Sequence, residues 1–216
     1  DYENKMLHLE MQNLRSQMNP HFIFNALNSI NSFIVENKTH LASDYLTKFS
    51  RLIRLILDNS KNESISLEKE LEALRLYLLM ESIRFDKKFE YTVHTGTGID
   101  EQLLKVPPMI IQPYAENAIW HGLLQKEEKG KVEVSIKKHG GVLLIIIKDN
   151  GIGRSKAAAL KTKNSTSTKS YGMQITAQRI KQLNSKNKVE TFDMKDAEGN
   201  ALGTKVVVTI YAYNES

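Results

Sequence analysis

Two kinds of apolar periodicity divide the sequence near Phe85. Before this residue, apolar side chains recur every three or four positions, which places them on one face of an α-helix. Beyond it, apolar and polar residues alternate over short segments, as in strands that bury one face. The sequence therefore predicts an α+β fold, with helices first and a layered arrangement of sheet and helices after them.

The segment 2–36 contains no glycine and opens with an apolar seam at spacings of 4, 3 and 4. This spacing predicts a long helix that packs on another helix. The apolar seam comprises Leu7, Met11, Leu14 and Met18. Beyond Pro20 the same seam is polar and consists of His21, Asn25, Asn28 and Ser32. Because proline removes a backbone hydrogen bond, we expect a kink at Pro20.

A second amphipathic stretch, from Ala42 to Ile56, follows a short link at residues 37–40 and predicts a helical hairpin. One hairpin cannot cover its own apolar faces, so we expect two copies to form a homodimeric four-helix bundle. After a polar break at residues 58–66, a row of leucines predicts a third helix. This row comprises Leu67, Leu71, Leu74 and Leu78.

The remaining sequence predicts a sheet with helices layered on one face. Helices are expected at residues 108–121, where Gly122 would end the helix, and at residues 172–184. A turn at 139–141 would join the middle two strands. Strands are expected at residues 89–95, 131–137, 142–147 and 206–213.

The composition excludes several classes of protein. The 216 residues include no cysteine, which excludes disulfides, thiolate nucleophiles and cysteine-ligated zinc. The longest apolar run, residues 142–147, is far shorter than the roughly 20 residues of a membrane-spanning helix. The helical pattern begins at once, without Met or a signal peptide, so we expect a soluble part of a longer protein.

The net charge of +5 comes from one stretch. Residues 154–169 include five basic and no acidic residues, and the remaining 25 basic residues balance the 25 acidic ones. Because this stretch is rich in Ser and Thr and poorly patterned, we interpret it as a mobile loop that faces phosphates. A solvated linker has the same composition, and nucleic-acid binding is a third interpretation of the charge.

A carboxylate and two glycines follow the most apolar predicted strand. They are Asp149, Gly151 and Gly153. A buried Asp at a strand end can accept a hydrogen bond from an amino group such as that of adenine, and glycines let a flat ring approach the main chain. An acidic turn that only closes the strand is the alternative interpretation.

Glu116, Asn117 and His121 lie together on the helix predicted before Gly122. The spacing of four places Asn117 and His121 on one helix face. An amide oxygen is a suitable ligand for Mg²⁺, which takes most other ligands from phosphates and water. Ordinary solvated helix positions show the same residues.

Two weaker signals follow along the chain. Gly172 and Met173 open the last predicted helix, where free backbone amides can bind an anion. Thr204 precedes the last predicted strand. Each signal is weak alone, but their order after Asn117 and Asp149 forms a recognisable set.

This order resembles the nucleotide-binding domain shared by gyrase, Hsp90, histidine kinases and MutL, called GHKL. Residues 17–28 read Gln-Met-Asn-Pro-His-Phe-Ile-Phe-Asn-Ala-Leu-Asn and resemble the phosphoacceptor motif of the LytS/YehU-type sensor histidine kinases. Residues 116–122 are similar to the N box of the same family. The resemblance extends from Leu14 to Thr209.

The resemblance implies a dimerisation and histidine phosphotransfer region at residues 1–66 and an ATP-binding α/β sandwich at 67–216. His21 would be the phosphoacceptor, Asn117 the magnesium ligand and Asp149 the residue that reads adenine. The other positions assigned to nucleotide binding are His121, Gly151, Gly153, Lys169, Gly172, Met173 and Thr204. The implied activity is autophosphorylation with ATP and Mg²⁺, followed by transfer to an aspartate of a response regulator.

The same resemblance implies a bacterial two-component system. The chain would be the cytoplasmic portion of an inner-membrane sensor, with its membrane segments outside this sequence. Its partner would be a response regulator, often of the LytTR type, and no direct contact with nucleic acid is implied. The alternative function is a nucleotide-binding dimeric scaffold without phosphotransfer.

The sequence departs from the wider kinase pattern after the predicted phosphoacceptor. Phe22 stands where many other histidine kinases have an acidic residue, so the motif assigns no general base. Glu116 is the candidate because it adjoins the magnesium ligand, whereas Asn25 can orient the imidazole but cannot act as a base. Trp120 is expected to pack in the core.

Overall fold

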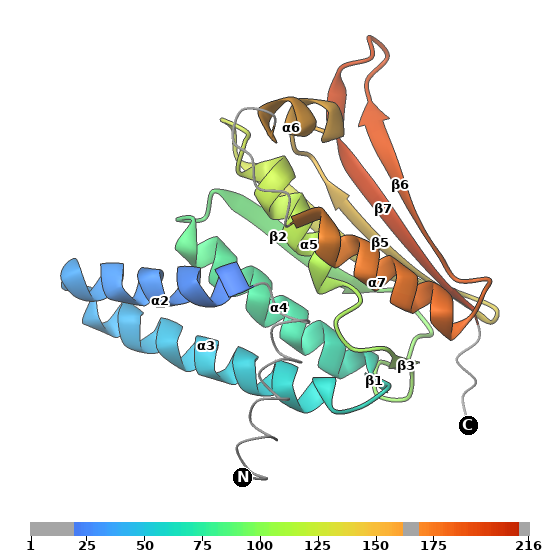
Figure 1. The fold of residues 1–216 in the computed structure, drawn as a ribbon, viewed down its shortest axis with the longest axis horizontal. Helices are drawn as coiled ribbons and strands as arrows, with labels where there is room; N and C mark the ends of the chain where they lie inside the picture. Colours follow the sequence, from blue (N-terminus) through green and yellow to red (C-terminus); the bar gives the residue numbers. More distant parts are fainter. Residues whose placement is uncertain (1–19, 162–168, 212–216) are drawn as a thin grey trace.

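The computed structural model describes residues 20–161 and 169–211. The apolar seam expected before Pro20, and with it the kink, lies outside these residues. Within them, no helix is both long and apolar enough to cross a membrane. Figure 1 shows two helices side by side at one side of the molecule and a twisted sheet at the other, with further helices between them.

The helices α2 (Pro20–Val35) and α3 (Thr39–Ser60) form the predicted hairpin. Asn37 has a φ of 58°, the left-handed conformation that Asn tolerates better than most residues, and it reverses the chain between the helices. The rings of Phe33 and Tyr45 pack edge to face across the hairpin, with 5.6 Å between their centroids. The hairpin is therefore stabilised by aromatic packing.

The predicted third helix, α4 (Leu67–Arg84), lies between the hairpin and the sheet. The hydroxyl of Ser66 caps its start by accepting a hydrogen bond from the backbone N–H of Lys69 at 3.4 Å. Because α4 is covered on two sides, it is buried over most of its circumference. Tyr77 of α4 packs on Phe22 of α2, with 5.2 Å between the ring centroids. The hairpin and the sheet therefore share one hydrophobic core.

Five strands form one mixed sheet in the order β2-β4-β5-β7-β6, and helices cover one of its faces (Figure 1). The strands are β2 (Phe89–Thr95), β4 (Gly130–His139), β5 (Val142–Asp149), β6 (Lys188–Lys195) and β7 (Ala201–Tyr211). β2 runs parallel to β4, and the other neighbours are antiparallel. The layered α+β prediction is confirmed.

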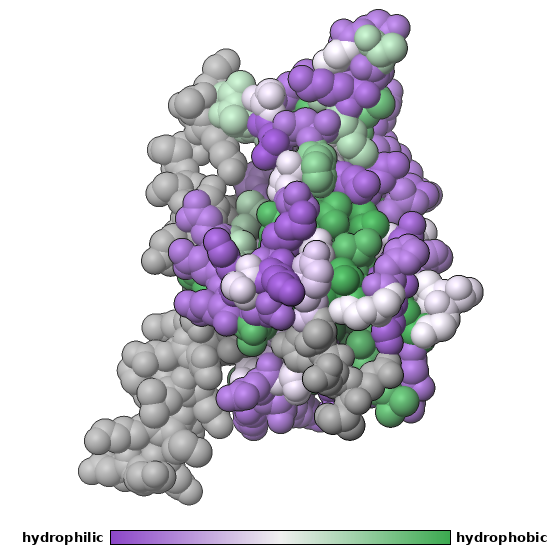
Figure 2. All heavy atoms as spheres, turned by 90° about the vertical axis from the view of Figure 1, so that its right-hand side faces the viewer, coloured by the Kyte–Doolittle hydropathy of each residue, from purple (hydrophilic) through white to green (hydrophobic). Residues whose placement is uncertain are grey.

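The two faces of the sheet differ in burial. Ile145 and Ile147 of β5 are buried against the helices, while Ile146 between them is only half-buried and pairs with Val207 on the opposite face. Figure 2 shows the side of the molecule at the right of Figure 1, where hydrophilic side chains surround a hydrophobic area. The alternation along β5 therefore separates the core from the outer face.

Three strands are not predicted by the sequence. β6 is an edge strand whose residues are mostly polar and exposed or half-buried, so its pattern does not alternate clearly. β1 (Ile65–Ser66) and β3 (Lys105–Val106) are only two residues long and pair with each other. Tertiary pairing, which single-sequence patterns do not report, determines all three.

The helix predicted at residues 108–121 differs from the structure at both ends. It begins four residues later, as α5 (Gln112–Asn117), and it continues past Gly122 as a π-helical turn, η1 (Ala118–Leu123). Gly122 therefore does not end the helix. Residues 107–111 form a loop instead, and a buried carboxylate of α4 determines its shape.

Glu70 of α4 is this buried carboxylate. Its two oxygens accept hydrogen bonds from the backbone N–H groups of Met109, Ile110 and Ile111 at 2.8 to 3.1 Å. Met109 has a φ of 59°, which is unusual for a residue with a side chain. Burial raises the pKa of Glu70, and the three N–H groups oppose this rise by stabilising the charged form.

We predict that Glu70→Ala strongly destabilises the protein. The substitution leaves three buried N–H groups without their acceptor, which we expect to lower the free energy of unfolding by about 3 kcal/mol or more. Urea denaturation would measure this loss. Glu68→Ala, at an exposed position of the same helix turn, is the matched control. Equal small losses in both variants would contradict the role of Glu70.

Candidate functional site

The predicted N box lies where α5 passes into the π-helical turn. Glu116 and Asn117 end α5, and His121 lies in η1; all three are half-buried. Single π-turns are rare and are frequent at functional sites. η1 packs against β4, β5, β7 and α6 (Arg154–Lys161), and α5 packs against α7 (Lys169–Leu183). The structure thus brings the N box to the elements that the sequence assigns to nucleotide binding.

Two glycines join the N box to the end of β5. A Cβ atom on Gly151 would lie 2.4 Å from the Cα of Gly122, and a Cβ atom on Gly122 would lie 2.8 Å from Oδ1 of Asp149. The N–H of Ile152 donates to the carbonyl oxygen of Gly122 at 3.2 Å. Close backbone packing therefore requires glycine at both positions.

A further glycine, on β7, closes the other side of Asp149. Gly203 has a φ of 120°, and a Cβ atom there would lie 2.0 Å from the carbonyl oxygen of Asp149. Thr204, the next residue, is buried and pairs with Asp149 across β5 and β7. Gly153 has a φ of 79° in the turn that follows Asp149. Gly151, Gly203 and Thr204 therefore contact Asp149, and Gly153 lies in the turn that follows it.

Asp149 itself is 5% exposed. Its Oδ1 accepts a hydrogen bond from the N–H of Gly151 at 2.9 Å. Burial raises its pKa to about 6, while the N–H groups of Gly151 and Thr204 act in the opposite direction. A buried carboxylate that still accepts hydrogen bonds is suited to recognise a donor such as the amino group of adenine.

The first half of the basic stretch is helical, so the prediction of a loop is wrong for residues 154–161. Three consecutive alanines at 157–159 favour α6, because Ala has the highest helix propensity. The guanidinium of Arg154 pairs with both carboxylate oxygens of Asp193 on β6, at 2.7 and 2.8 Å. Arg154 therefore binds the edge of the sheet. Residues 162–168, including Lys163, lie outside the described residues.

The last predicted site residues belong to α7. This helix begins at Lys169, three residues before its expected start, and Gly172 lies within its first turn. The side chain of Lys169 lies outside the described residues. Met173 is half-buried and packs against the core. Because α7 packs on α5, Gly172 and Met173 belong to a helix that contacts the N-box helix.

His21 is exposed, and it lies against the N box of the same chain. Its ring packs on the ring of Trp120, with 5.1 Å between the centroids and 62° between the planes. Nδ2 of Asn25 lies 2.9 Å from Nδ1 of His21. With the amide in this orientation Nδ1 accepts and the ring proton is on Nε2, whereas the flipped amide would favour a lone pair on Nε2. Asn25 therefore contacts the ring atoms that determine the tautomer.

Trp120 is half-buried and packs on several residues, as predicted. The guanidinium of Arg84 lies 4.8 Å from the centre of its ring, and Phe85 packs against it at 5.4 Å. The sequence did not indicate that His21 is among its partners. Trp120 therefore connects α2, which carries the predicted phosphoacceptor, with α4 and the N box.

Glu116 faces charged and polar groups of α4. Its negative charge contributes to the raised pKa values of Tyr77 and Glu81. Glu81 is fully buried, and burial raises its pKa to about 7, although Arg84 lowers it. The predicted base, Glu116, is therefore next to a second carboxyl group that sequence reasoning missed.

The sequence does contain a signal for Glu81. The leucine row of α4 has spacings of 4, 3 and 4, and Glu81 stands three residues after Leu78, at the next position of the row. A carboxylate at an apolar seam position is a candidate for a buried, functional charge. Glu70 gives a weaker signal, because it adjoins the seam residue Leu71.

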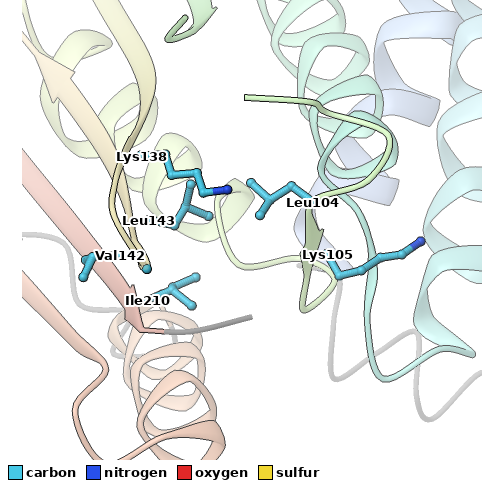
Figure 3. A pocket seen from close by; sticks show the side chains of 7 residues that line it. Leu104, Lys105, Lys138, Val142, Leu143 and Ile210 are labelled. Carbon is cyan, nitrogen blue, oxygen red and sulfur yellow. The ribbon is translucent and has the colours of Figure 1, made fainter. Parts of the chain in front are cut away.

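A small cavity of about 30 Å³ lies away from this site (Figure 3). Leu104 of the loop before β3 and Lys138 of β4 line it, together with Val142 at the start of β5. Asp149 is at the other end of β5. This cavity is therefore not part of the candidate nucleotide site.

We predict that Asp149→Asn makes the protein more stable above pH 6. The folded-state pKa of about 6 exceeds the ordinary 3.8, so the folded protein binds the extra proton and loses stability as the pH rises between these values. The amide of the variant does not ionise, so it avoids this loss of stability. At pH 8 we expect the free energy of unfolding of the variant to exceed that of the wild type by about 1 to 3 kcal/mol, and this difference should vanish below pH 4. Thermal unfolding at several pH values would measure it.

Asp193→Asn is the control with the opposite sign. Arg154 lowers the pKa of Asp193, so its ionised form is favoured by folding and its amide should bring no gain at pH 8. A gain in Asp193→Asn, or none in Asp149→Asn, would contradict the assigned environments.

Comparisons with known proteins show what the chain is similar to. Residues 9–89 match the family described as histidine kinase. The sensor histidine kinase/phosphatase LytS of Staphylococcus aureus is 35% identical over 148 residues, which cover 68% of this chain and 25% of LytS. The chain therefore spans about a quarter of the length of the curated relatives that it matches.

A solved structure shows the same fold. The histidine kinase domain of the EL346 blue-light activated histidine kinase from Erythrobacter litoralis has a TM-score of 0.50 and 15% sequence identity, over 94% of this chain and 95% of that one. The family match at residues 9–89 includes the motif at His21. The chain therefore belongs to the histidine kinase family, and its relatives are of the LytS type.

Proposed function

We propose that this chain is the catalytic part of a sensor histidine kinase that transfers the γ-phosphoryl group of ATP to His21. The observation that carries the proposal is the packing of the His21 ring on Trp120, within the N box. Asn117 lies three residues before Trp120, and η1 packs on the strand that ends at Asp149. The predicted phosphoacceptor on α2 therefore contacts the same helical segment, α5 with η1, that carries Asn117.

The transfer needs little covalent chemistry from the protein. A lone pair on an imidazole nitrogen of His21 forms a P–N bond while the bond between the γ-phosphorus and the bridging oxygen breaks, which leaves ADP. The ring proton leaves to a base or to water. Glu116 remains our candidate for this base, and the contact with Asn25 supports its role in orienting the imidazole.

The side chains and backbone groups at this site are suited to bind ATP together with Mg²⁺. Asp149 offers a buried acceptor for adenine, and the first turn of α7 offers backbone amides for phosphates. The described residues contain no group of three His, Asp or Glu that would bind a metal alone. A single amide ligand such as Asn117 suits Mg²⁺, which neutralises phosphate charge when bound.

We predict that the chain incorporates phosphate from γ-labelled ATP and that His21→Gln abolishes the incorporation. The label should be acid-labile and base-stable, as expected of a phosphorylated imidazole, and scintillation counting after each treatment measures it. His40→Gln, an exposed histidine on α3, is the matched control and should label normally. His21→Gln should still bind ATP.

Two outcomes would contradict the kinase proposal. Binding of ATP without labelling would favour the nucleotide-binding scaffold. Steeply salt-dependent DNA binding without nucleotide affinity would favour the nucleic-acid interpretation. Both can be measured on the same wild-type preparation.

We also propose a homodimer formed through the hairpin. Phe24, Leu27 and Ile34 of α2 are 48 to 66% exposed, and their spacings of 3 and 7 place them along one helix face. An apolar helix face of this kind is suited to a four-helix bundle made from two hairpins. This surface supports the proposed division into a dimerising region, 1–66, and an ATP-binding region, 67–216.

We predict that Leu27→Glu disrupts the dimer. The carboxylate would be buried without a partner at the interface, so the variant should sediment as a monomer at micromolar concentration, where the wild type should be dimeric. Ile175→Glu, an exposed apolar position on α7, is the control and should leave the mass unchanged. A monomeric wild type would contradict the proposal.

The partner that we propose is a response regulator, which would receive the phosphoryl group on an aspartate. The similarity to a sensor histidine kinase, LytS, supports this assignment. A regulator of the LytTR type is proposed from the resemblance of the motif at residues 17–28. The resemblance of the same motif is the basis for proposing that this chain is the cytoplasmic portion of an inner-membrane sensor. Three quarters of LytS lie outside the matched segment.

A further inference from the structure

We propose that Glu81 is a positioning residue for the phosphoacceptor. With Arg84 it fixes Trp120, and Trp120 in turn holds the ring of His21 beside the N box. The inference rests on the proposed kinase function for its consequence, although the contacts themselves do not depend on it. Three elements meet here: α2 carries His21, α4 carries Glu81 and Arg84, and η1 carries Trp120.

The contacts form a continuous series. Oε1 of Glu81 accepts a hydrogen bond from Nη1 of Arg84 at 3.2 Å. The guanidinium of Arg84 lies over two rings, 4.5 Å from the centre of Phe85 and 4.8 Å from that of Trp120. Trp120 then packs edge-on against His21 at 5.1 Å. A displacement of Arg84 would therefore move the surface on which the phosphoacceptor rests.

Burial makes this series sensitive to charge. The side chain of Glu81 is fully buried, and that of Arg84 is 14% exposed. Oε2 of Glu81 has no hydrogen-bond partner among the described residues. A buried ion pair of this kind is costly in desolvation and is a poor source of stability, so a role in specifying geometry is the better explanation.

The charged and polar groups around Glu81 come from three other elements. Glu116 of α5 opposes its ionisation, whereas Arg84 and the indole N–H of Trp120 favour it. Burial raises the pKa of Tyr45 on α3, and the negative charge of Glu81 raises it further. With a pKa of about 7, the carboxyl of Glu81 becomes ionised as the pH rises through neutrality, and its attraction for Arg84 then increases.

The first test uses fluorescence, because Trp120 is the only tryptophan in the chain. A protonated imidazole in contact with an indole quenches its emission, so emission should fall as the pH is lowered through the histidine range. His21→Gln should remove this fall. We expect Glu81→Gln to remove it as well, although His21 is still present, and to shift the emission maximum.

The second test is the rate of labelling with γ-labelled ATP. We expect Glu81→Gln to lower the maximal rate about 10- to 100-fold, the scale of a small misplacement of a reacting group. The KM for ATP should stay unchanged, because the site at Asp149 is built on β5 and β7 and Glu81 belongs to α4. The wild-type rate should rise with pH near neutrality, and this limb should be absent in Glu81→Gln.

Glu72→Gln is the matched control. It removes a carboxylate from the same helix, where Glu72 pairs with Arg51 of α3 at 2.5 Å, and it should change neither the fluorescence nor the rate. If Glu81→Gln keeps the quenching amplitude and the rate of the wild type, the proposal is wrong. Thermal unfolding of each variant separates loss of position from loss of folding.

The two proposals can fail separately. If the wild type shows no labelling but the fluorescence behaves as described, the kinase assignment fails while Glu81 still positions Trp120. If His21→Gln abolishes labelling but Glu81→Gln leaves fluorescence and rate unchanged, the kinase assignment stands and the role of Glu81 fails.

Discussion

The architecture depends on α4, a helix buried on two sides that includes two buried carboxylates. Its apolar residues join the hairpin to the sheet in one core, so neither part covers its surface without the other. Glu70 shapes the loop that precedes the N-box helix, and Glu81 interacts with Trp120 of η1. α4 therefore determines both where the helix of the N box begins and which side chains contact Trp120 at the other end of the N box.

Glycines have the corresponding role on the opposite side of the N box. The contact between Gly122 and Gly151 allows no side chain, and it brings η1 against the end of β5 at the distance of bare backbones. Packing of this kind is stiff, because a displacement of one backbone moves the other. Asp149 is thereby held close to the helix of Asn117, with Thr204 on the neighbouring strand.

Periodicity was sufficient to predict the elements that have a regular apolar pattern. The hairpin, α4, β2 and the β4–β5 turn follow from helical spacing, strand alternation and a pair of glycines. The edge strand β6 and the late start of α5 do not, because sheet pairing and the carboxylate of Glu70 determine them across long sequence distances. Local patterns cannot report a hydrogen bond that joins residues 40 positions apart.

In the candidate site, too, local sequence predicts some residues, whereas contacts between elements determine the others. The motifs indicated His21, Asn117 and Asp149, since each stands in a distinctive local sequence. Trp120 and Arg84 gain their roles only from contacts between elements, and no spacing within one helix predicts them. Glu81 is intermediate, because its place in the leucine row was visible while its partners were not.

Buried carboxyl groups on either side of the N box have a common physical consequence. Burial raises the pKa of Asp149 to about 6 and that of Glu81 to about 7. The folded protein therefore becomes less stable when either carboxyl group ionises. Apolar residues of similar size would avoid this loss. Under the proposed function, the two carboxyl groups are acceptors at the positions that would hold the nucleotide and the phosphoacceptor, so the cost in stability falls where geometry would determine the reaction.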